Sequence, residues 1–167
     1  MVLQDKIIFT YFDEGVFGDE GPNSEGLTVF NFEGRQLFGF NSASMALIGD
    51  SDALIDDCYA ICKLDEHRIL FYVYSNFSLI ELNIETFEWK LHPTSAEYLG
   101  ANSMACRDGQ VVFHGTYKDK QSFFLWDILQ EKVTKFGNYS AILRGLENGK
   151  FLSVNKSGFT IINPFDE

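Results

Sequence analysis

The chain has 167 residues, enough for one well-packed core and too few for two ordinary domains, so we expect a single domain over residues 1–167. Hydrophobic residues make up 46% and charged residues 22%, with only 3 Pro, which excludes the disordered and collagen-like classes. No apolar run approaches the roughly 20 residues of a membrane-spanning helix. The first residues also lack the basic start of a signal peptide. We therefore expect a cytoplasmic protein that does not enter a membrane.

The net charge of −11 is concentrated at the start of the chain. Residues 1–60 hold 11 acidic and 2 basic side chains, a balance of −9, whereas residues 61–167 hold 13 acidic and 11 basic ones, a balance of −2. Much of the excess lies in two segments with the composition of loops, Asp13–Gly26 and Asp50–Asp57. This charge would repel a phosphate backbone, which argues against nucleic-acid binding, and would attract a basic protein. The alternative is that the acidic loops only keep the protein soluble.

The first predicted unit has three short apolar strands, at Lys6–Phe12, Gly26–Phe32 and Arg35–Phe40. It lacks a strand before Lys6. The connection Ser42–Ile55 that follows has helix formers after a candidate cap at Ser42, but Gly49 and the nearby Asp residues limit the helix to a turn or two.

Three more units repeat this pattern of strands and polar turns. The second unit is predicted at Cys58–Leu64, Arg68–Tyr74, Ser78–Ile84 and Phe87–His92. The third is predicted at Ser103–Arg107, Gln110–Tyr117, Ser122–Ile128 and Lys132–Phe136, and the fourth at Ile142–Leu146, Lys150–Asn155 and Gly158–Pro164. In every unit a polar Asn or Asp ends the equivalent strand directly before a turn, at Asn31, Asn83, Asp127 and Asn163.

A spacing of about 40 residues between the later units, with four strands in each, is typical of propeller blades. We therefore expect an all-β fold, a propeller-like array of about four β-meander units of which the first and last are incomplete. A sandwich or barrel with a similar number of strands would also suit the pattern. Incomplete end units leave unpaired strand edges, so we expect the ends to pair with each other or to be covered by a partner or a second copy.

The stretches Tyr11-Phe-Asp-Glu-Gly-Val-Phe-Gly, Ile55-Asp-Asp-Cys-Tyr-Ala and Phe71-Tyr-Val-Tyr-Ser-Asn-Phe-Ser-Leu resemble those of a group of uncharacterised bacterial propeller-like proteins. The resemblance covers roughly residues 6–115, and this chain looks like a shortened relative. The group implies an architecture and no activity. Small acidic β-rich bacterial proteins of this sort are similar, as a class, to immunity proteins that neutralise toxins.

Most motifs that carry enzyme chemistry are missing from the sequence. The 3 Cys residues, Cys58, Cys62 and Cys106, fit neither a disulfide framework nor a common zinc pattern, so we expect free thiols that pack as small hydrophobic groups. The 3 His residues are scattered without ligand spacing. There is no Gly-x-Ser-x-Gly elbow and no phosphate-binding loop. We predict no catalytic residues, no metal site and no cofactor.

The acidic loops are the strongest candidates for a functional site. The predicted partner-binding residues are Asp13, Glu14, Phe17, Asp19, Glu20, Asp50, Asp52, Asp56 and Asp57. Phe17 lies between acidic residues and is a candidate interface anchor, with a loop Phe that caps the core as the alternative. The carboxylates could also hold Ca²⁺, although their spacing does not match a calcium-binding loop, or act as a pair in glycoside hydrolysis.

We predict a non-enzymatic protein-binding module that engages a basic protein, in its concrete form a bacterial immunity protein that neutralises a basic toxin domain. Two alternatives remain. One is a carboxylate-rich, metal-dependent carbohydrate-binding protein or hydrolase. The other is a structural homo-oligomer in which the incomplete end units complete one another.

Overall fold

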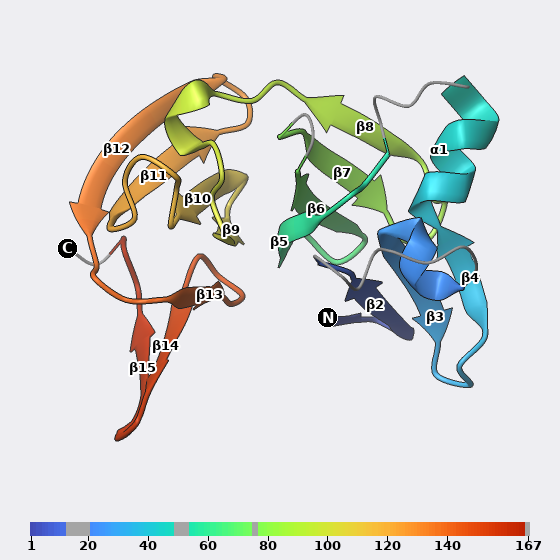
Figure 1. Cartoon of the computed structure of the whole chain (residues 1–167), viewed down its shortest axis with the longest axis horizontal. Helices are drawn as coiled ribbons and strands as arrows, with labels where there is room; N and C mark the ends of the chain where they lie inside the picture. Colours follow the sequence, from blue (N-terminus) through green and yellow to red (C-terminus); the bar gives the residue numbers. More distant parts are fainter. Residues whose placement is uncertain (13–20, 49–53, 75–76, 166–167) are drawn as a thin grey trace. The chain divides into compact units, whose positions relative to one another are not determined.

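The computed structural model describes residues 1–12, 21–48, 54–74 and 77–165 (Figure 1). Within these residues the chain is all-β and forms small antiparallel sheets in which consecutive strands pair as a meander. Four such sheets follow one another along the chain, which confirms the predicted propeller-like repeat. Residue contacts divide the chain into two compact units, Met1–Tyr59 with Asp65–His92, and Ala60–Leu64 with Pro93–Glu167.

The first sheet contains one strand more than the sequence predicts. Its strands are β1 (Val2–Leu3), β2 (Lys6–Thr10), β3 (Leu27–Asn31) and β4 (Gln36–Gly39), in that order. β1 supplies the opening strand that we expected to be absent, with Val2 paired to Ile7. The strand has only two residues, and its turn places the non-glycine residue Gln4 at φ +54°, so no glycine marks this turn in the sequence.

Helix α1 (Phe40–Ile48) follows β4 directly and begins before the predicted cap at Ser42. The carboxylate of Glu25, at the end of the 3₁₀ helix η2 (Pro22–Glu25), accepts hydrogen bonds from the Ser42 N–H at 2.8 Å and from the Ser42 hydroxyl at 2.7 Å. A negative charge at a helix N-terminus is stabilising. The helix is therefore anchored by a residue distant in sequence, and Ser42 lies inside it.

The second sheet contains β5 (Cys58–Lys63), β6 (Arg68–Val73), β7 (Leu79–Asn83) and β8 (Trp89–His92). Residues 69–73 of β6 are all buried, so both faces of this strand are covered, as its continuous apolar sequence predicts. Phe40 of α1 packs edge-on against Phe71, with ring centroids 5.2 Å apart, and Phe38 of β4 stacks on Phe87 at 4.8 Å. The face of the first sheet that carries Phe38 thus packs toward the second sheet.

The third sheet contains β9 (Ser103–Arg107), β10 (Gln110–His114), β11 (Ser122–Asp127) and β12 (Lys132–Asn138), with the short 3₁₀ helix η4 (Ala96–Tyr98) before it. The fourth contains β13 (Leu143–Gly145), β14 (Phe151–Asn155) and β15 (Gly158–Ile162). The described residues thus give the last sheet three strands, as predicted. The two sheets share a hydrophobic cluster that includes Ala105, Val112, Phe123, Phe151 and Ile162.

The Asn and Asp residues at the ends of the equivalent strands close the turns that follow them. The Asn83 side-chain oxygen accepts hydrogen bonds from the N–H groups of Glu85 and Thr86, at 2.9 and 3.1 Å. Asp127 does the same for Leu129 and Gln130, both at 2.9 Å. Asn31 accepts from the N–H of Arg35 and Asn163 from that of Phe165. Such side chains satisfy backbone donors that the turn would otherwise leave unpaired, which explains why the repeat places them there.

Candidate functional site

Seven of the nine predicted partner-binding residues lie outside the described residues: Asp13, Glu14, Phe17, Asp19, Glu20, Asp50 and Asp52. The structure describes the other two, Asp56 and Asp57, directly before β5. Asp56 is exposed and Asp57 is half-buried.

Backbone hydrogen bonds bring the ends of the two acidic segments together. The N–H of Cys58 donates to the carbonyl of Tyr11 at 3.0 Å, and the N–H of Tyr74 donates to the carbonyl of Asp57 at 2.8 Å. Asp57 therefore lies between the end of β2 and the end of β6. In the sequence, Asp13 directly follows Phe12, so the described residue before one acidic segment lies near the last residue of the other.

Four aromatic side chains lie near the backbone of Asp57. They are Phe12, Tyr59, Tyr74 and Phe77, which we call the aromatic patch. The ring centroids of Phe12 and Tyr59 are 5.4 Å apart, and Tyr59 stacks on Tyr74 at 5.8 Å. Phe77 meets the rings of Tyr74 and Tyr59 nearly edge-on, at 5.6 and 6.3 Å. Phe12 is 57% exposed and Tyr74 is 42% exposed, so the patch presents ring surface to solvent while its members hold one another in place.

The backbone of Phe77 shows that the patch is held under some strain. Phe77 has φ +50°, in the left-handed region, which costs a non-glycine residue about 1 kcal/mol or more. Its ring contacts with Tyr59, Tyr74 and the buried Tyr72 offset this cost. A residue kept in this conformation by aromatic contacts supports a fixed arrangement of rings.

Partly exposed aromatic rings beside carboxylates can bind a cationic group in two ways. The ring faces attract Lys and Arg side chains through cation–π contacts, and the carboxylates form ion pairs with them. Rigid aromatic side chains are also frequent anchors of protein interfaces. The sequence pattern makes Phe12 and Tyr74 the last residues of two predicted strands, Lys6–Phe12 and Arg68–Tyr74. The structure ends β2 at Thr10 and β6 at Val73, which leaves both residues just beyond a strand and exposed.

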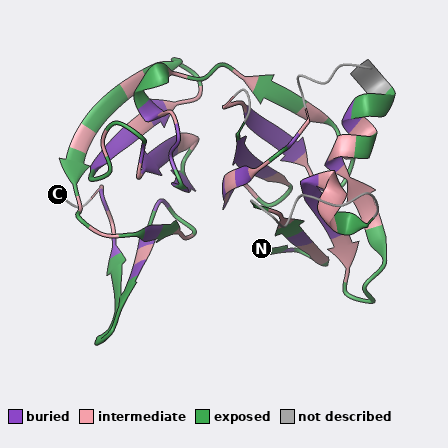
Figure 2. Cartoon of the chain, viewed as in Figure 1, coloured by how far each residue is buried: buried purple, intermediate pink, exposed green. Residues whose placement is uncertain are grey.

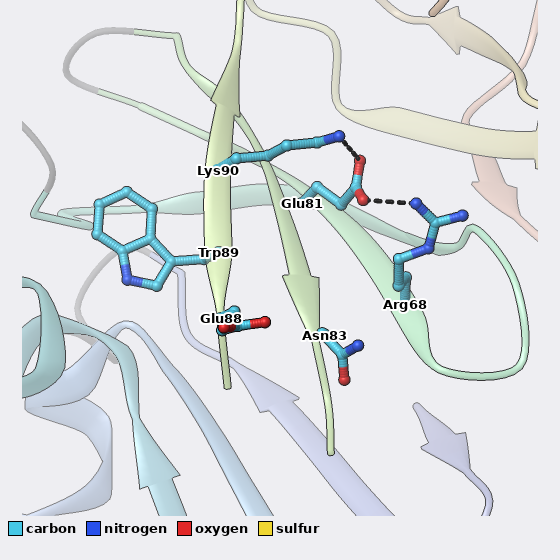
Figure 3. Close-up of a pocket in the computed structure, with 6 residues that line it drawn as sticks. All are labelled: Arg68, Glu81, Asn83, Glu88, Trp89 and Lys90. Carbon is cyan, nitrogen blue, oxygen red and sulfur yellow. Dashed lines mark hydrogen bonds and ion pairs between the residues drawn. The ribbon is translucent and has the colours of Figure 1, made fainter. Parts of the chain in front are cut away.

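A second cluster of charged groups surrounds Glu81 on β7 (Figure 3). The Glu81 carboxylate is buried and lies 2.8 Å from Nη1 of Arg68, 2.8 Å from Nε2 of His92 and 3.2 Å from Nζ of Lys90. The strand register places Lys90 directly opposite Glu81 and His92 opposite Leu79, so alternation puts these side chains on one face of the sheet. Arg68 also pairs with Asp65 at the preceding turn.

Burial by itself would raise the pKa of Glu81, but the hydrogen bonds from His92, Arg68 and Lys90 outweigh burial and lower it. Glu81 is therefore a charged acceptor whose oxygens are already used by the protein. The adjoining cavity has a volume of about 230 Å³, lined by Arg68, Glu81, Asn83, Glu88, Trp89 and Lys90 (Figure 3). This is smaller than most small-molecule sites, which span roughly 300–1,000 Å³. The cluster is best explained as an internal ion-pair network of the second sheet.

The cysteines and His114 lie in the core. The 3 cysteines are buried thiols, and burial raises the pKa of the Cys62 thiol well above its ordinary value, with Cys106 raising it further. His114 is buried, and its Nε2–H donates to the carbonyl of Tyr139 at 2.9 Å. In the part of the chain that the structure describes, no three His, Cys, Asp or Glu side chains are grouped as metal ligands would be.

Comparisons with known proteins add little on function. No family model matches the chain, and no curated protein matches its sequence. A crystal structure of the extracellular domain of a protein assigned as a one-component system of B. thetaiotaomicron is similar, with a TM-score of 0.45 and 12% sequence identity. The match covers 86% of this chain and 20% of that one. Among the described residues, no helix has the length and apolar character needed to cross a membrane.

Proposed function

We propose that the chain is a non-enzymatic protein-binding module that engages a basic partner through the aromatic patch and the acidic residues beside it. The observation that carries this proposal is the position of the Asp57–Cys58 backbone, which hydrogen-bonds to Tyr11 after β2 and to Tyr74 after β6, next to the four rings of the aromatic patch. The balance of −9 over residues 1–60 adds long-range attraction for a basic surface. A cationic toxin domain neutralised by this chain in the cytoplasm of a bacterium would be a partner of this kind.

We expect the aromatic patch to provide most of the binding free energy and the acidic residues to raise the rate of association. Truncation of an aromatic anchor at the centre of an interface commonly costs about 2 kcal/mol or more of binding free energy. Exposed carboxylates contribute mainly to the association rate, and salt screens their effect. A partner held in this way is therefore expected to bind more weakly as salt rises, and to lose most of its affinity when the rings are removed.

The test is a parallel capture of proteins from a lysate of the source organism, at low and moderate salt. The wild-type chain is compared with a Phe12→Ser, Tyr74→Ser variant and with a matched control, Phe32→Ser, which removes a 60%-exposed Phe outside the patch. We expect a stoichiometric basic protein on the wild type and the control, and little of it on the double variant. Equal capture of the basic protein by the double variant would refute the role of the aromatic patch in binding.

A charge-reversal variant at Asp13, Glu14, Asp19 and Glu20 tests the acidic segment separately. It is expected to slow association with the captured protein and to flatten the salt dependence of the rate, with little effect on the thermal unfolding temperature. An unchanged rate would remove the acidic segment from the interface.

A further inference from the structure

One face of the first sheet carries apolar side chains that are partly exposed. Alternation and the register place Val2, Ile7, Phe9 and Phe30 on the same face, which we call the N-terminal face. Val2 is 59% exposed and Phe9 is 50% exposed, and the rings of Phe9 and Phe30 pack edge-on at 5.8 Å. The opposite face is the one that carries Phe38 and packs toward the second sheet.

The last sheet, at the other end of the repeat, also has a face with exposed apolar side chains. Val154 pairs with Phe159 and Leu152 with Ile161, so these four side chains share one face, which we call the C-terminal face. Val154 is 67% exposed, Phe159 is 71% exposed and Ile161 is 55% exposed, and Figure 2 shows the β14–β15 hairpin as largely exposed. The opposite face carries Phe151 and Ile162, which are buried in the cluster shared with the third sheet.

The N-terminal face belongs to the first sheet of the repeat and the C-terminal face to the last. The first sheet packs on the sheet that follows it, and its free face is the one that would receive a preceding sheet. The last sheet packs on the sheet before it, and its free face is the one that would receive a following sheet. Repeat arrays normally end in polar capping units that prevent further stacking. Here the exposed faces of both end sheets are apolar. One of them is placed to receive a preceding sheet and the other to receive a following sheet, so the two faces could pack on each other.

The exposed area also suits contact with a second copy. With roughly 200 Å² for a large aromatic side chain, the exposed apolar side chains offer about 200 Å² on the N-terminal face and about 300 Å² on the C-terminal face. One contact then removes about 500 Å² of apolar surface, to which the strand backbones and polar rims add. This lies at the low end of specific interfaces, so the association should be weak and dependent on concentration.

We propose that the C-terminal face packs on the N-terminal face of a second copy of this chain, head to tail. The contact is heterologous, because different surfaces of the two copies meet. The contact uses none of the residues of the aromatic patch, so it can be tested independently of the proposed binding function.

The mass of the chain in solution, measured by sedimentation over a range of concentrations, tests the association. We expect species heavier than 19.0 kDa that increase with concentration. Phe159→Glu and Phe9→Glu should each raise the dissociation constant by more than about tenfold. Leu129→Glu is the matched control, because Leu129 is 93% exposed at the β11–β12 turn and belongs to neither face. A mass of 19.0 kDa at every concentration, or an oligomer unaffected by both variants, would overturn the proposal.

A crosslinking experiment identifies which faces meet. Chains that carry only Phe9→Cys are mixed with chains that carry only Phe159→Cys and treated with a short bifunctional maleimide, while the native thiols stay buried. The head-to-tail contact predicts a crosslinked dimer in the mixture and little in either variant alone. Crosslinking within each variant alone would show contact between identical faces. Chains that carry both substitutions are treated in the same way, and a crosslink that forms only within such single chains would show that the two faces meet inside one chain. Contact between identical faces and contact within one chain would each refute the proposal.

Discussion

Replacement of Glu81 by Gln tests whether the buried charge network stabilises the second sheet. The substitution keeps the size of the side chain and one oxygen acceptor, and it removes the negative charge that three cationic or polar groups approach within 3.2 Å. We expect the variant to fold, because Glu81 lies on a sheet whose other face is formed by large apolar side chains such as Phe71.

The expected loss is about 2 kcal/mol of unfolding free energy at neutral pH. Hydrogen bonds to charged groups contribute about 1.5–3 kcal/mol each, and removing one partner of a fully buried ion pair costs about 3–5 kcal/mol. The Arg68 and Lys90 side chains are 42% and 59% exposed, so water can take up the freed charges and the loss falls below that range. Glu88→Gln is the matched control on the same cavity, with an exposed side chain, and should change the stability by less than about 0.5 kcal/mol.

The pH dependence separates this explanation from a simple packing defect. The pKa of Glu81 is lowered in the folded chain from its ordinary value of 4.5, so the stabilisation is fully present above 4.5 and is lost as pH falls through the folded-state pKa. The wild type and Glu81→Gln should therefore differ at neutral pH and converge in acid. Urea unfolding followed by the fluorescence of Trp89 and Trp126 measures the difference at each pH. A difference that stays constant from neutral to acidic pH would refute the role of the charge.

Substitutions at three further positions test other parts of the fold. Gly145→Ala should lower stability by about 2 kcal/mol in urea unfolding, because an added Cβ would overlap the backbone carbonyl of Met104. Burial lowers the pKa of His114 from 6.5, so as pH falls below 6.5 the unfolded chain binds a proton that the folded chain does not, and stability should fall. His114→Gln should lose that slope in unfolding measured across this range. Asn83→Ala should cost about 1 kcal/mol in thermal unfolding and Asn83→Asp much less, because the turn N–H groups of Glu85 and Thr86 keep an acceptor only in the latter.

Much of the fold follows from local patterns in the sequence. The strands of the middle sheets are recognisable because their continuous apolar runs end at polar turns, and a side chain such as Asn83 or Asp127 marks each turn through its own hydrogen bonds. β1 could not be recognised, since two residues carry no period and its turn lacks glycine. The start of α1 could not be placed either, because it depends on Glu25, which is distant in sequence.

The candidate site was only partly predictable for a related reason. Charge density is a property of composition, so the acidic segments are visible in the sequence. The aromatic patch depends on hydrogen bonds between Tyr11 and Cys58 and between Asp57 and Tyr74, which join distant parts of the chain. Alternation assigns Phe12 and Tyr74 to strands, and only the observed ends of β2 and β6 reveal that both rings are exposed.

The acidic residues of the first third do not all serve one purpose. Glu25 accepts two hydrogen bonds from Ser42 at the start of α1, so its charge is committed to the helix. Asp5 is paired with Lys6 at 2.8 Å, and the hydrogen bond from Lys6 lowers the pKa of Asp5. Glu25 and Asp5 therefore contribute less to the attraction that we propose for a basic partner than their formal charges suggest. Charge reversal at Glu25 would report on helix stability, and reversal beside the patch would report on binding, so the two effects can be measured separately.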